Sequence, residues 1–210
     1  MSFETFEKLP AEKKDLILKA GIREFSVKSF QEAGTDRITK QCGISKGILF
    51  HYFGSKKDFY LYCLEKAMER LTEKTEAAEG NDFYEILFAE MDRKIRKCMQ
   101  YPDEMHLVNM ASRDVSAQIT QEKTEILRKY KEVTQKESAE ILGRAMSALD
   151  LKNDIKQKIT AEGLQIYITA IMNRYLVQYQ AEPNAFFENS KKIRKEMREY
   201  LDLMLYGICR

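Results

Sequence analysis

The residues best suited to a specific chemistry lie together in one stretch, T-D-R-I-T-K-Q-C-G-I-S-K-G-I-L-F-H-Y-F-G-S-K, residues 35–56. A helix that begins after Ser45 would turn Gly47, Ile48 and His51 away from a protein core and place Lys46, Phe50 and Tyr52 on its flanks. One cation, a bare glycine and a row of aromatic and imidazole groups make an unusual solvent face. They suit a surface that enters a DNA major groove, where close backbone approach and planar groups are useful.

Two short helices around a tight turn would position these residues. Thr35 is a good N-cap for the first helix. Gly43 then stands where a helix-turn-helix needs a left-handed residue, a conformation that glycine adopts without a steric penalty. Ser45 is expected to cap the second helix, in which Leu49 and Phe53 share the buried face. The pattern therefore predicts a helix-turn-helix.

The segment I-S-K-G-I-L-F-H-Y-F-G-S-K, residues 44–56, resembles the recognition-helix signature of the TetR family of one-component transcriptional regulators. The similarity begins at I-L-K-A-G-I-R-E-F, residues 17–25, and runs to about Tyr62. The resemblance implies a DNA-binding regulator that is expected to act as a repressor, and it implies no enzyme activity. It also implies DNA contacts from ten residues: Thr35, Arg37, Ser45, Lys46, Gly47, Ile48, Phe50, His51, Tyr52 and Lys56.

Six positions depart from the commonest family pattern, among them Thr39 and Cys42, which replace alanines in the first helix of the motif. Ser29 stands where a glycine is usual, and Gly34 stands where a threonine is usual. Ile48 replaces a frequent threonine and Phe50 a frequent tyrosine, so two hydroxyls that could bond phosphates or base edges are absent. Apolar contact with thymine methyl groups becomes the expected interaction at those two positions.

The composition is that of a globular protein. The chain has 210 residues, of which 44% are hydrophobic and 32% charged, so it can bury a core in one or two domains. Residues 1–57 contain eleven Lys and Arg against seven Asp and Glu, which makes this part positive, as expected of a part that meets phosphates. No apolar run is long enough for a membrane span, and the N-terminus lacks a signal-peptide core, so a cytoplasmic location is expected.

Metal and catalytic signatures are missing from the sequence. The possible soft ligands are few and far apart: Cys42, Cys63, Cys98, Cys209, His51 and His106. That spacing predicts neither a metal site nor a disulfide framework, and buried free thiols are expected instead. No nucleophile elbow, phosphate-binding glycine loop or H-E-x-x-H motif occurs, and no cofactor is expected.

The whole chain is expected to be all-α, with about nine helices. Residues 1–56 would form a three-helix DNA-binding headpiece, and residues 57–210 a larger helical body for ligand binding and dimerisation. Pro10 suits the first turn of the first long helix. Outside the helix-turn-helix, helical periodicity predicts these segments: 10–28, 56–78, 82–100, 102–111, 120–149, 159–179 and from 183 onward.

The body is rich in methionine, with tyrosines in the same segments. Methionine lines adaptable pockets, so a cavity for a small lipophilic or aromatic effector is a hypothesis for this region. Its candidate lining residues are Met91, Met110, Tyr167, Met172 and Tyr175. The alternative is that each methionine only fills a gap in the core. A DNA-binding architectural protein without an effector is the rival function, and it would need no cavity.

The last two helices carry more apolar residues than one buried face needs. Residues 159–179 are apolar almost all round, which implies burial against a pocket, another subunit or both. The resemblance implies a homodimer through these helices, which would bind a palindromic operator. The expected interface residues are Ile168, Ile171, Tyr175, Met197, Leu201 and Met204. The alternative is that both helices belong to the core of one subunit.

Overall fold

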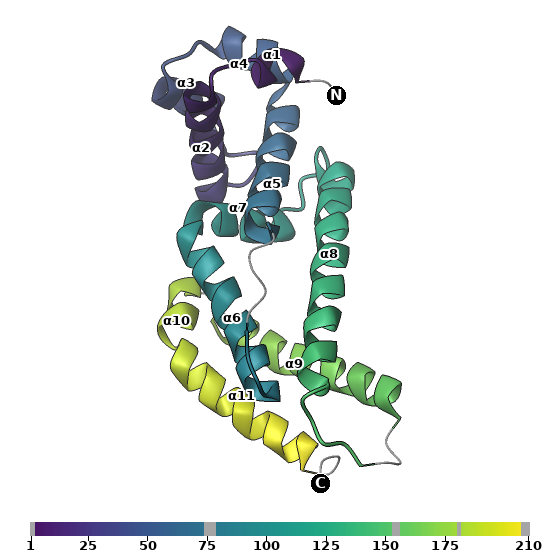
Figure 1. Cartoon of the computed structure of the whole chain (residues 1–210). Helices are drawn as coiled ribbons and strands as arrows, with labels where there is room; N and C mark the ends of the chain where they lie inside the picture. Colours follow the sequence, from purple (N-terminus) through teal and green to yellow (C-terminus); the bar gives the residue numbers. More distant parts are fainter. Residues whose placement is uncertain (1–2, 74–78, 153–155, 180–181, 207–210) are drawn as a thin grey trace. The chain divides into compact units, whose positions relative to one another are not determined.

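The computed structural model describes residues 3–73, 79–152, 156–179 and 182–206 (Figure 1). The elements along these residues are α-helices, which confirms the all-α class, with eleven in place of the expected nine. Their bounds are α1 Glu4–Glu7, α2 Ala11–Val27, α3 Thr35–Cys42, α4 Lys46–Phe53, α5 Lys56–Thr72, α6 Phe83–Gln100, α7 Pro102–Arg113, α8 Thr120–Met146, α9 Gln157–Gln178, α10 Pro183–Glu188 and α11 Ser190–Leu205.

The chain divides into two compact units, and each combines segments that are distant in the sequence. The first unit is Met1–Lys74 with Gln100–Thr134, and the second is Thr75–Met99 with Gln135–Arg210. Helix α8 contributes its first half to one unit and its second half to the other. The domain boundary expected between residues 56 and 57 separates a DNA-binding headpiece from a helical body, and this functional division stays a prediction.

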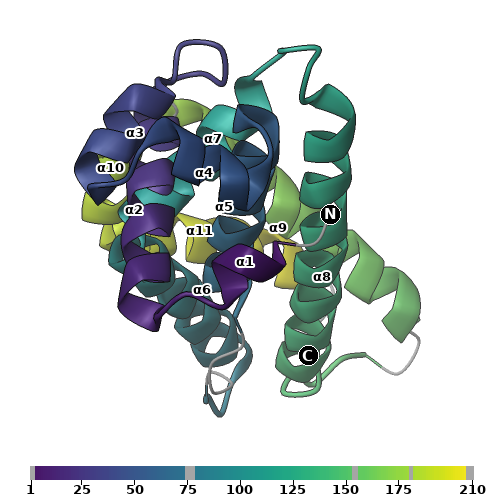
Figure 2. The same cartoon turned by 90° about the horizontal axis from the view of Figure 1, so that it is seen from above.

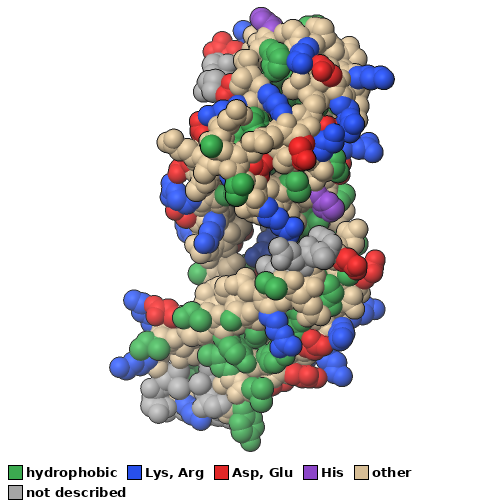
Figure 3. Space-filling view, turned by 180° about the vertical axis from the view of Figure 1, so that it is seen from behind, with side chains coloured by type: hydrophobic (Ala, Val, Ile, Leu, Met, Phe, Trp, Pro, Cys, Tyr) green, Lys and Arg blue, Asp and Glu red, His purple; other side chains and the backbone are tan. Residues whose placement is uncertain are grey.

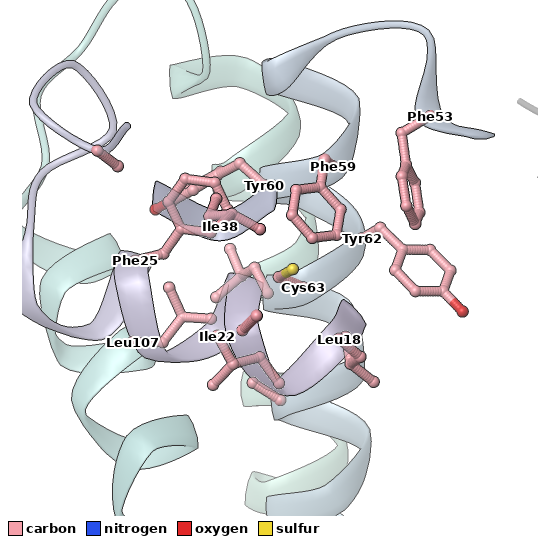
Figure 4. Close-up of a cluster of buried hydrophobic side chains, with 14 of the residues drawn as sticks. Leu18, Ile22, Phe25, Ile38, Phe53, Phe59, Tyr60, Tyr62, Cys63 and Leu107 are labelled. Carbon is pink, nitrogen blue, oxygen red and sulfur yellow. The ribbon is translucent and has the colours of Figure 1, made fainter. Parts of the chain in front are cut away.

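The first unit is built around the close crossing of α2 and α5. A Cβ atom on Gly21 of α2 would lie 2.4 Å from Cζ of Phe59 and 2.7 Å from Sγ of Cys63, so only glycine permits this approach. Figure 4 shows the buried side chains around the crossing, with Phe25 and Ile22 reaching toward α5. These helices therefore form a rigid base for the short helices that follow α2.

Helix α7 completes the core of the first unit. It packs against both α2 and α5, and Leu107 and Ala111 on its inner face have no exposed surface. Ile119 and Tyr130 at the start of α8 join the same hydrophobic cluster. Both views place α3 and α4 at the same end of this unit as α1 (Figures 1 and 2). The helix-turn-helix thus rests on a core that includes residues beyond the first 100.

The second unit contains α6, the second half of α8 and the last three helices. One of its clusters joins Phe83, Leu142 and Leu164, which come from α6, α8 and α9. A second cluster joins Phe88 with Ile171 and with residues of α11. Residues of α9 that face inward are therefore buried within the subunit itself.

Several expected helix bounds were wrong. Pro10 is the N-cap of α2 and not its first helical residue. The helix expected over 56–78 ends at Thr72, while residues 74–78 lie outside the described part of the chain. The single final helix is interrupted at Asn189 between α10 and α11. The short helix α1 was not foreseen, since four residues are too few to show a periodicity.

Candidate functional site

The helix-turn-helix begins at α3, and its N-terminus differs from the expected one. Gly34 is the N-cap, with extended backbone angles and no side chain to offer, and Thr35 is already helical. The Thr35 side chain is buried, with 7% of its surface exposed, so it is poorly placed for the DNA contact expected of it. The Glu24 carboxylate of α2 accepts a hydrogen bond from the Gly34 N–H at 3.0 Å. A side chain of the preceding helix, α2, thus satisfies a backbone N–H at the start of α3, where a local capping side chain was expected.

The turn between α3 and α4 has the predicted geometry. Gly43 has φ of 64°, and the following Ile44 N–H donates to the Thr39 carbonyl oxygen at 3.1 Å. Ser45 caps α4, because its Oγ accepts a hydrogen bond from the Ile48 N–H at 3.2 Å. Each feature fixes the direction in which α4 leaves the turn.

Two buried residues set the rotation of α4 about its own axis. Leu49 has no exposed surface and Phe53 has 1%. With that face inward, α4 presents Lys46, Gly47, Ile48 and His51 to solvent, while Phe50 and Tyr52 are half-buried at the edges. The predicted outward face of the helix agrees with this arrangement.

The cations around this face are already engaged with acidic groups of the protein. Lys46 Nζ lies 3.1 Å from Oδ1 of Asp36, and both side chains are exposed. Arg37 Nη1 lies 3.8 Å from Oε2 of Glu24, which is buried to 3% exposure. Lys28 Nζ lies 3.8 Å from the other oxygen of the same carboxylate. Glu24 therefore positions two cations near the start of α3. Its place in the sequence of α2, next to Phe25, did not indicate this role.

Lys56 has a structural role that sequence reasoning missed. Its Nζ donates to the Gln31 carbonyl oxygen at 3.2 Å and lies 4.9 Å from the centre of the Phe30 ring. Burial lowers the pKa of this amine from its ordinary value, and the nearby Glu24 carboxylate partly offsets that shift. Lys56 therefore ties the loop before α3 to the start of α5 in the free protein.

The recognition helix is supported from behind by the N-terminal helix. The Phe6 ring of α1 lies 4.7 Å from the Phe53 ring, centre to centre, and Phe6 is 1% exposed. Tyr62 of α5 donates from its hydroxyl to Oε1 of Glu7 at 2.7 Å. That hydrogen bond is the main reason why the pKa of Glu7 lies below its usual value. Helix α1 is thereby fixed against both α4 and α5.

The second unit contains a cavity of about 230 Å³ among α6, α8, α9 and α11. Seven of its thirteen lining residues are aliphatic, and six are polar or charged. The lining residues are Leu87, Glu90, Met91, Lys94, Ser138, Ile141, Leu142, Gln165, Ile168, Thr169, Met172, Asn173 and Met197.

Two of the five residues expected to line a ligand site do so, namely Met91 and Met172. Met110 belongs to α7 of the first unit. Tyr167 donates from its hydroxyl to the Tyr200 carbonyl oxygen at 3.1 Å, and Tyr175 donates to Glu196 Oε2 at 2.7 Å. Both tyrosines therefore serve the packing of α9 on α11. The polar groups at the cavity come from α6, α8 and α9, namely Glu90, Lys94, Ser138, Gln165, Thr169 and Asn173.

The residues expected at a dimer interface lie mostly within the subunit. Four of the six are almost fully buried in it, with exposed fractions of 9% or less: Ile171, Tyr175, Met197 and Leu201. Ile168 and Met204 are half-buried against the same core. Seen from behind, the second unit nevertheless carries hydrophobic side chains on its surface (Figure 3). Exposed large hydrophobic residues of α9 and the end of α11 are Ile159, Ile166, Val177, Leu203 and Tyr206.

Cys42 and Cys63 are free and buried, as expected, whereas Cys98 is free but only half-buried. Burial raises the pKa of Cys42 to about 11 and raises the pKa of the fully buried Cys63 as well. Both thiols are therefore protonated and poorly nucleophilic at neutral pH. Within the described residues, no group of three or more potential ligands is placed to hold a metal ion. The same residues contain no helix that is both long and apolar enough to cross a membrane.

Comparison with known proteins places the helix-turn-helix in a family. Residues 17–63 match the family model described as bacterial regulatory proteins, tetR family. The chain is also similar to the uncharacterized HTH-type transcriptional regulator YerO of Bacillus subtilis (strain 168), with 34% identity over 80 residues. That similarity covers 36% of this chain and 28% of the length of YerO.

Solved structures extend the similarity of fold to nearly the whole chain. A TetR family transcriptional regulator from Chloroflexus aurantiacus J-10-FL aligns over 99% of this chain and 98% of its own, with a TM-score of 0.62 and 22% identity. The fatty acid degradation regulator FadR from Bacillus halodurans aligns over 90% and 95%, with a TM-score of 0.64 and 16% identity. NalD of Pseudomonas aeruginosa, the secondary repressor of the MexAB-OprM efflux pump, aligns over 95% and 98%, with a TM-score of 0.55 and 16% identity. Residues 17–63 thus match the tetR family of bacterial regulatory proteins, and the fold of the chain is similar to that of solved TetR-family structures.

Proposed function

We propose that this chain is a transcriptional regulator that binds duplex operator DNA in the cytoplasm as a homodimer. We further propose that it acts as a repressor and leaves its operator when a small effector binds the second unit. The observation that carries the proposal is the outward face of α4, where Lys46, Gly47, Ile48 and His51 are exposed while Leu49 and Phe53 fix the helix from behind.

Each exposed group has a distinct part in DNA recognition. Lys46 would contact a phosphate, which contributes affinity without sequence preference. Gly47 would let the helix backbone approach the groove closely. Ile48, 40% exposed, offers an apolar surface for a thymine methyl group, and the His51 ring can bond a base edge or a phosphate.

A dimer would use the outer face of the last helices and not the residues buried in the subunit. Ile159, Ile166 and Val177 are spaced by seven and eleven residues, so they fall on one side of α9. Leu203 lies 76% exposed on α11. Burial of this stripe against a second copy would remove several large hydrophobic residues from water. A two-fold symmetric dimer could then place its two α4 helices in successive major grooves of DNA, which are about 34–36 Å apart.

The cavity supports an effector-controlled regulator over an architectural protein without an effector. Part of its lining comes from α6, which is separated from α7 by Tyr101 alone, and from α8, which has residues in both compact units. A ligand that changes these helices can therefore act on the unit that carries α4. It can shift DNA binding only by its difference in affinity for the two protein shapes, so operator DNA must weaken effector binding by the same factor.

The test is the anisotropy of a labelled random-sequence DNA duplex, titrated with the protein across a range of salt concentrations. Affinity should fall steeply with salt, and Lys46→Ala should weaken binding and reduce the salt slope by about one unit. Lys131→Ala, which removes an exposed cation from α8, should change neither quantity. Selection from a randomised duplex library should then enrich a palindrome. Absence of duplex binding at low salt would refute the proposal.

A further inference from the structure

We propose that the cavity of the second unit binds a small monocarboxylate with an aliphatic body, whose anionic group is held by Lys94 and Ser138. This inference rests on the proposed effector function and names the chemical class of the effector. The relevant observation is a polar cluster on α6 and α8 in which the Lys94 ammonium group makes no contact shorter than 3.3 Å with the described residues, beside a lining of aliphatic side chains and three uncharged polar ones.

The charge balance of this cluster is set by Glu90. Its side chain is 8% exposed, and Arg93 binds it in a bidentate pair, with Nε at 2.7 Å from Oε2 and Nη2 at 2.6 Å from Oε1. A bidentate guanidinium–carboxylate pair is the strongest form of this interaction. Glu90, together with the nearby Glu137 carboxylate, raises the pKa of Arg93. Glu90 is therefore compensated by Arg93 before Lys94 is considered.

Lys94 lines the cavity and has only weak partners among the described residues. Its Nζ lies 3.7 Å from Oε1 of Glu90, beyond hydrogen-bond distance, and 3.3 Å from Oγ of Ser138. An ammonium group has three N–H donors, so at least one remains available for an incoming acceptor. The Ser138 hydroxyl can also rotate to donate to the same acceptor. The site thus offers a positive charge and a second donor for one carboxylate.

The rest of the lining selects the body of the ligand. Leu142 and Met197 are buried to 4% and 2% exposure, and with Met91 and Met172 they form an aliphatic part of a lining that has no aromatic ring. Three residues of α9 add uncharged polar groups to it, namely Gln165, Thr169 and Asn173. Flexible methionine side chains adapt to ligands of different shape. A cavity of about 230 Å³ has room for a compact aliphatic molecule and not for a large one.

A cationic ligand fits this cavity poorly. It would need a free carboxylate, yet both oxygens of Glu90 are bonded to Arg93, and Lys94 would repel it at close range. A neutral ligand of the same shape would gain the aliphatic contacts but would leave the Lys94 charge unused. Affinity should therefore rank carboxylate first, then alcohol, then amine.

The experiment measures binding of octanoate, octanol and octylamine to the full-length protein by calorimetry, with hexanoate and decanoate to define the length. Lys94→Met removes the charge and keeps the aliphatic stem. We expect it to weaken octanoate binding by about tenfold or more while octanol binding stays unchanged. Arg96→Met is the matched control, because Arg96 is an exposed cation on α6 outside the cavity lining, and it should leave binding of both compounds unchanged.

The outcomes distinguish this inference from the proposed function. Octylamine binding more tightly than octanoate, an unchanged octanoate affinity in Lys94→Met, or no binding of any carboxylate would each overturn the assignment. Binding of duplex DNA is measured separately in the absence of these compounds. If DNA binding persists while carboxylates fail, the ligand class is wrong and the regulator remains; if DNA binding is absent, the proposed function itself fails.

Discussion

The Asp114 carboxylate accepts a hydrogen bond from the backbone N–H of Phe30 at 2.7 Å, across 84 residues of sequence. Its other oxygen accepts from the Ser116 N–H at 2.8 Å. Asp114 is the C-cap of α7, and Phe30 lies in the loop that leads into α3. The loop that leads into the helix-turn-helix is therefore held by a residue near the middle of the chain, so a displacement of α7 would act directly on the start of α3.

Asp114→Asn should reduce stability by about 1 kcal/mol at neutral pH, since a charged acceptor is replaced by a neutral one. Burial raises the pKa of Asp114, but the hydrogen bonds from Ser116 and Phe30 and the charge of Lys123 lower it below the ordinary 3.8. The ionised carboxylate thus contributes stability above that value, which is lost as pH falls through the lower folded-state pKa. Urea unfolding from pH 6 to pH 2 should give a shallower acid loss in Asp114→Asn. Asp103→Asn on the exposed face of α7 should follow the wild-type curve.

Gly47→Ala should separate folding from DNA recognition. A Cβ atom at this position would meet only Oγ of Ser45, at an ordinary 3.8 Å, so the free protein has room for it. Alanine is also the better helix former by roughly 0.5–1 kcal/mol, and the melting temperature should stay constant or rise. If α4 enters a groove closely, the methyl group should nevertheless weaken duplex binding by about tenfold. Unchanged DNA affinity would show that the closest contact between α4 and DNA does not lie at Gly47.

Asp36→Asn should strengthen DNA binding. The carboxylate lies 3.1 Å from Lys46 Nζ and competes with a phosphate for that ammonium group. Because the ion pair is exposed, its removal should make the free energy of DNA binding more favourable by on the order of 1 kcal/mol or less. That change corresponds to a gain of roughly threefold to fivefold in DNA affinity. The gain should shrink in a Lys46→Ala background, which anisotropy titrations of the double mutant would reveal. Glu140→Gln, on the exposed face of α8, serves as the control for net charge.

Phe6→Ala should impair both stability and DNA binding. The side chain is 1% exposed and contacts the ring of Phe53, so truncation should cost about 3–5 kcal/mol. Leu107→Ala on α7 removes a fully buried side chain from the same core but leaves the support of α4 intact. At a temperature where both variants are folded, Phe6→Ala should lose more DNA affinity than Leu107→Ala. Equal losses would show that α1 has no special role in positioning α4.

Ile166→Glu should produce monomers if the outer face of α9 is the dimer interface. The residue is 71% exposed in the subunit, so the substitution should not disturb folding, but a dimer would bury the new charge without a partner. Sedimentation velocity measures the mass, and DNA affinity should fall because two half-sites are no longer bridged. Val115→Glu replaces a 91% exposed residue outside this face and should stay dimeric. An Ile166→Glu dimer would place the interface elsewhere.

The helix-turn-helix could be predicted because its signals are local. Gly43 predicts the left-handed turn and Ser45 predicts the cap of α4. The spacing of Leu49 and Phe53 predicts the buried face of the helix. All of these depend on residues within a few positions of one another. The same local reasoning could not find Glu24, because the groups that surround its carboxylate come from a different helix and from the loop before it.

The body was harder to predict because α9 is apolar on two sides. Ile171 is 7% exposed while Ile166 is 71% exposed, yet both are isoleucines in one apolar helix. Composition alone cannot tell which side meets the subunit core and which side is left for a partner. The polar groups of the cavity were missed for a related reason, since Glu90 and Lys94 look like any solvated pair on a helix until Ser138 of α8 is placed beside them.

The core shared by α2, α5, α7 and the first half of α8 limits how this protein can exchange parts with its relatives. A chimaera joined just after α4 would separate Phe25 from Tyr60, whose rings lie 5.0 Å apart, and would leave Leu107 and Ile119 without their native neighbours. Recombination that keeps residues 1–74 together with 100–134 would preserve every contact of that core. Under the proposed function, DNA specificity and effector sensing would therefore be inherited in two interleaved sets of segments and not on either side of a single crossover point.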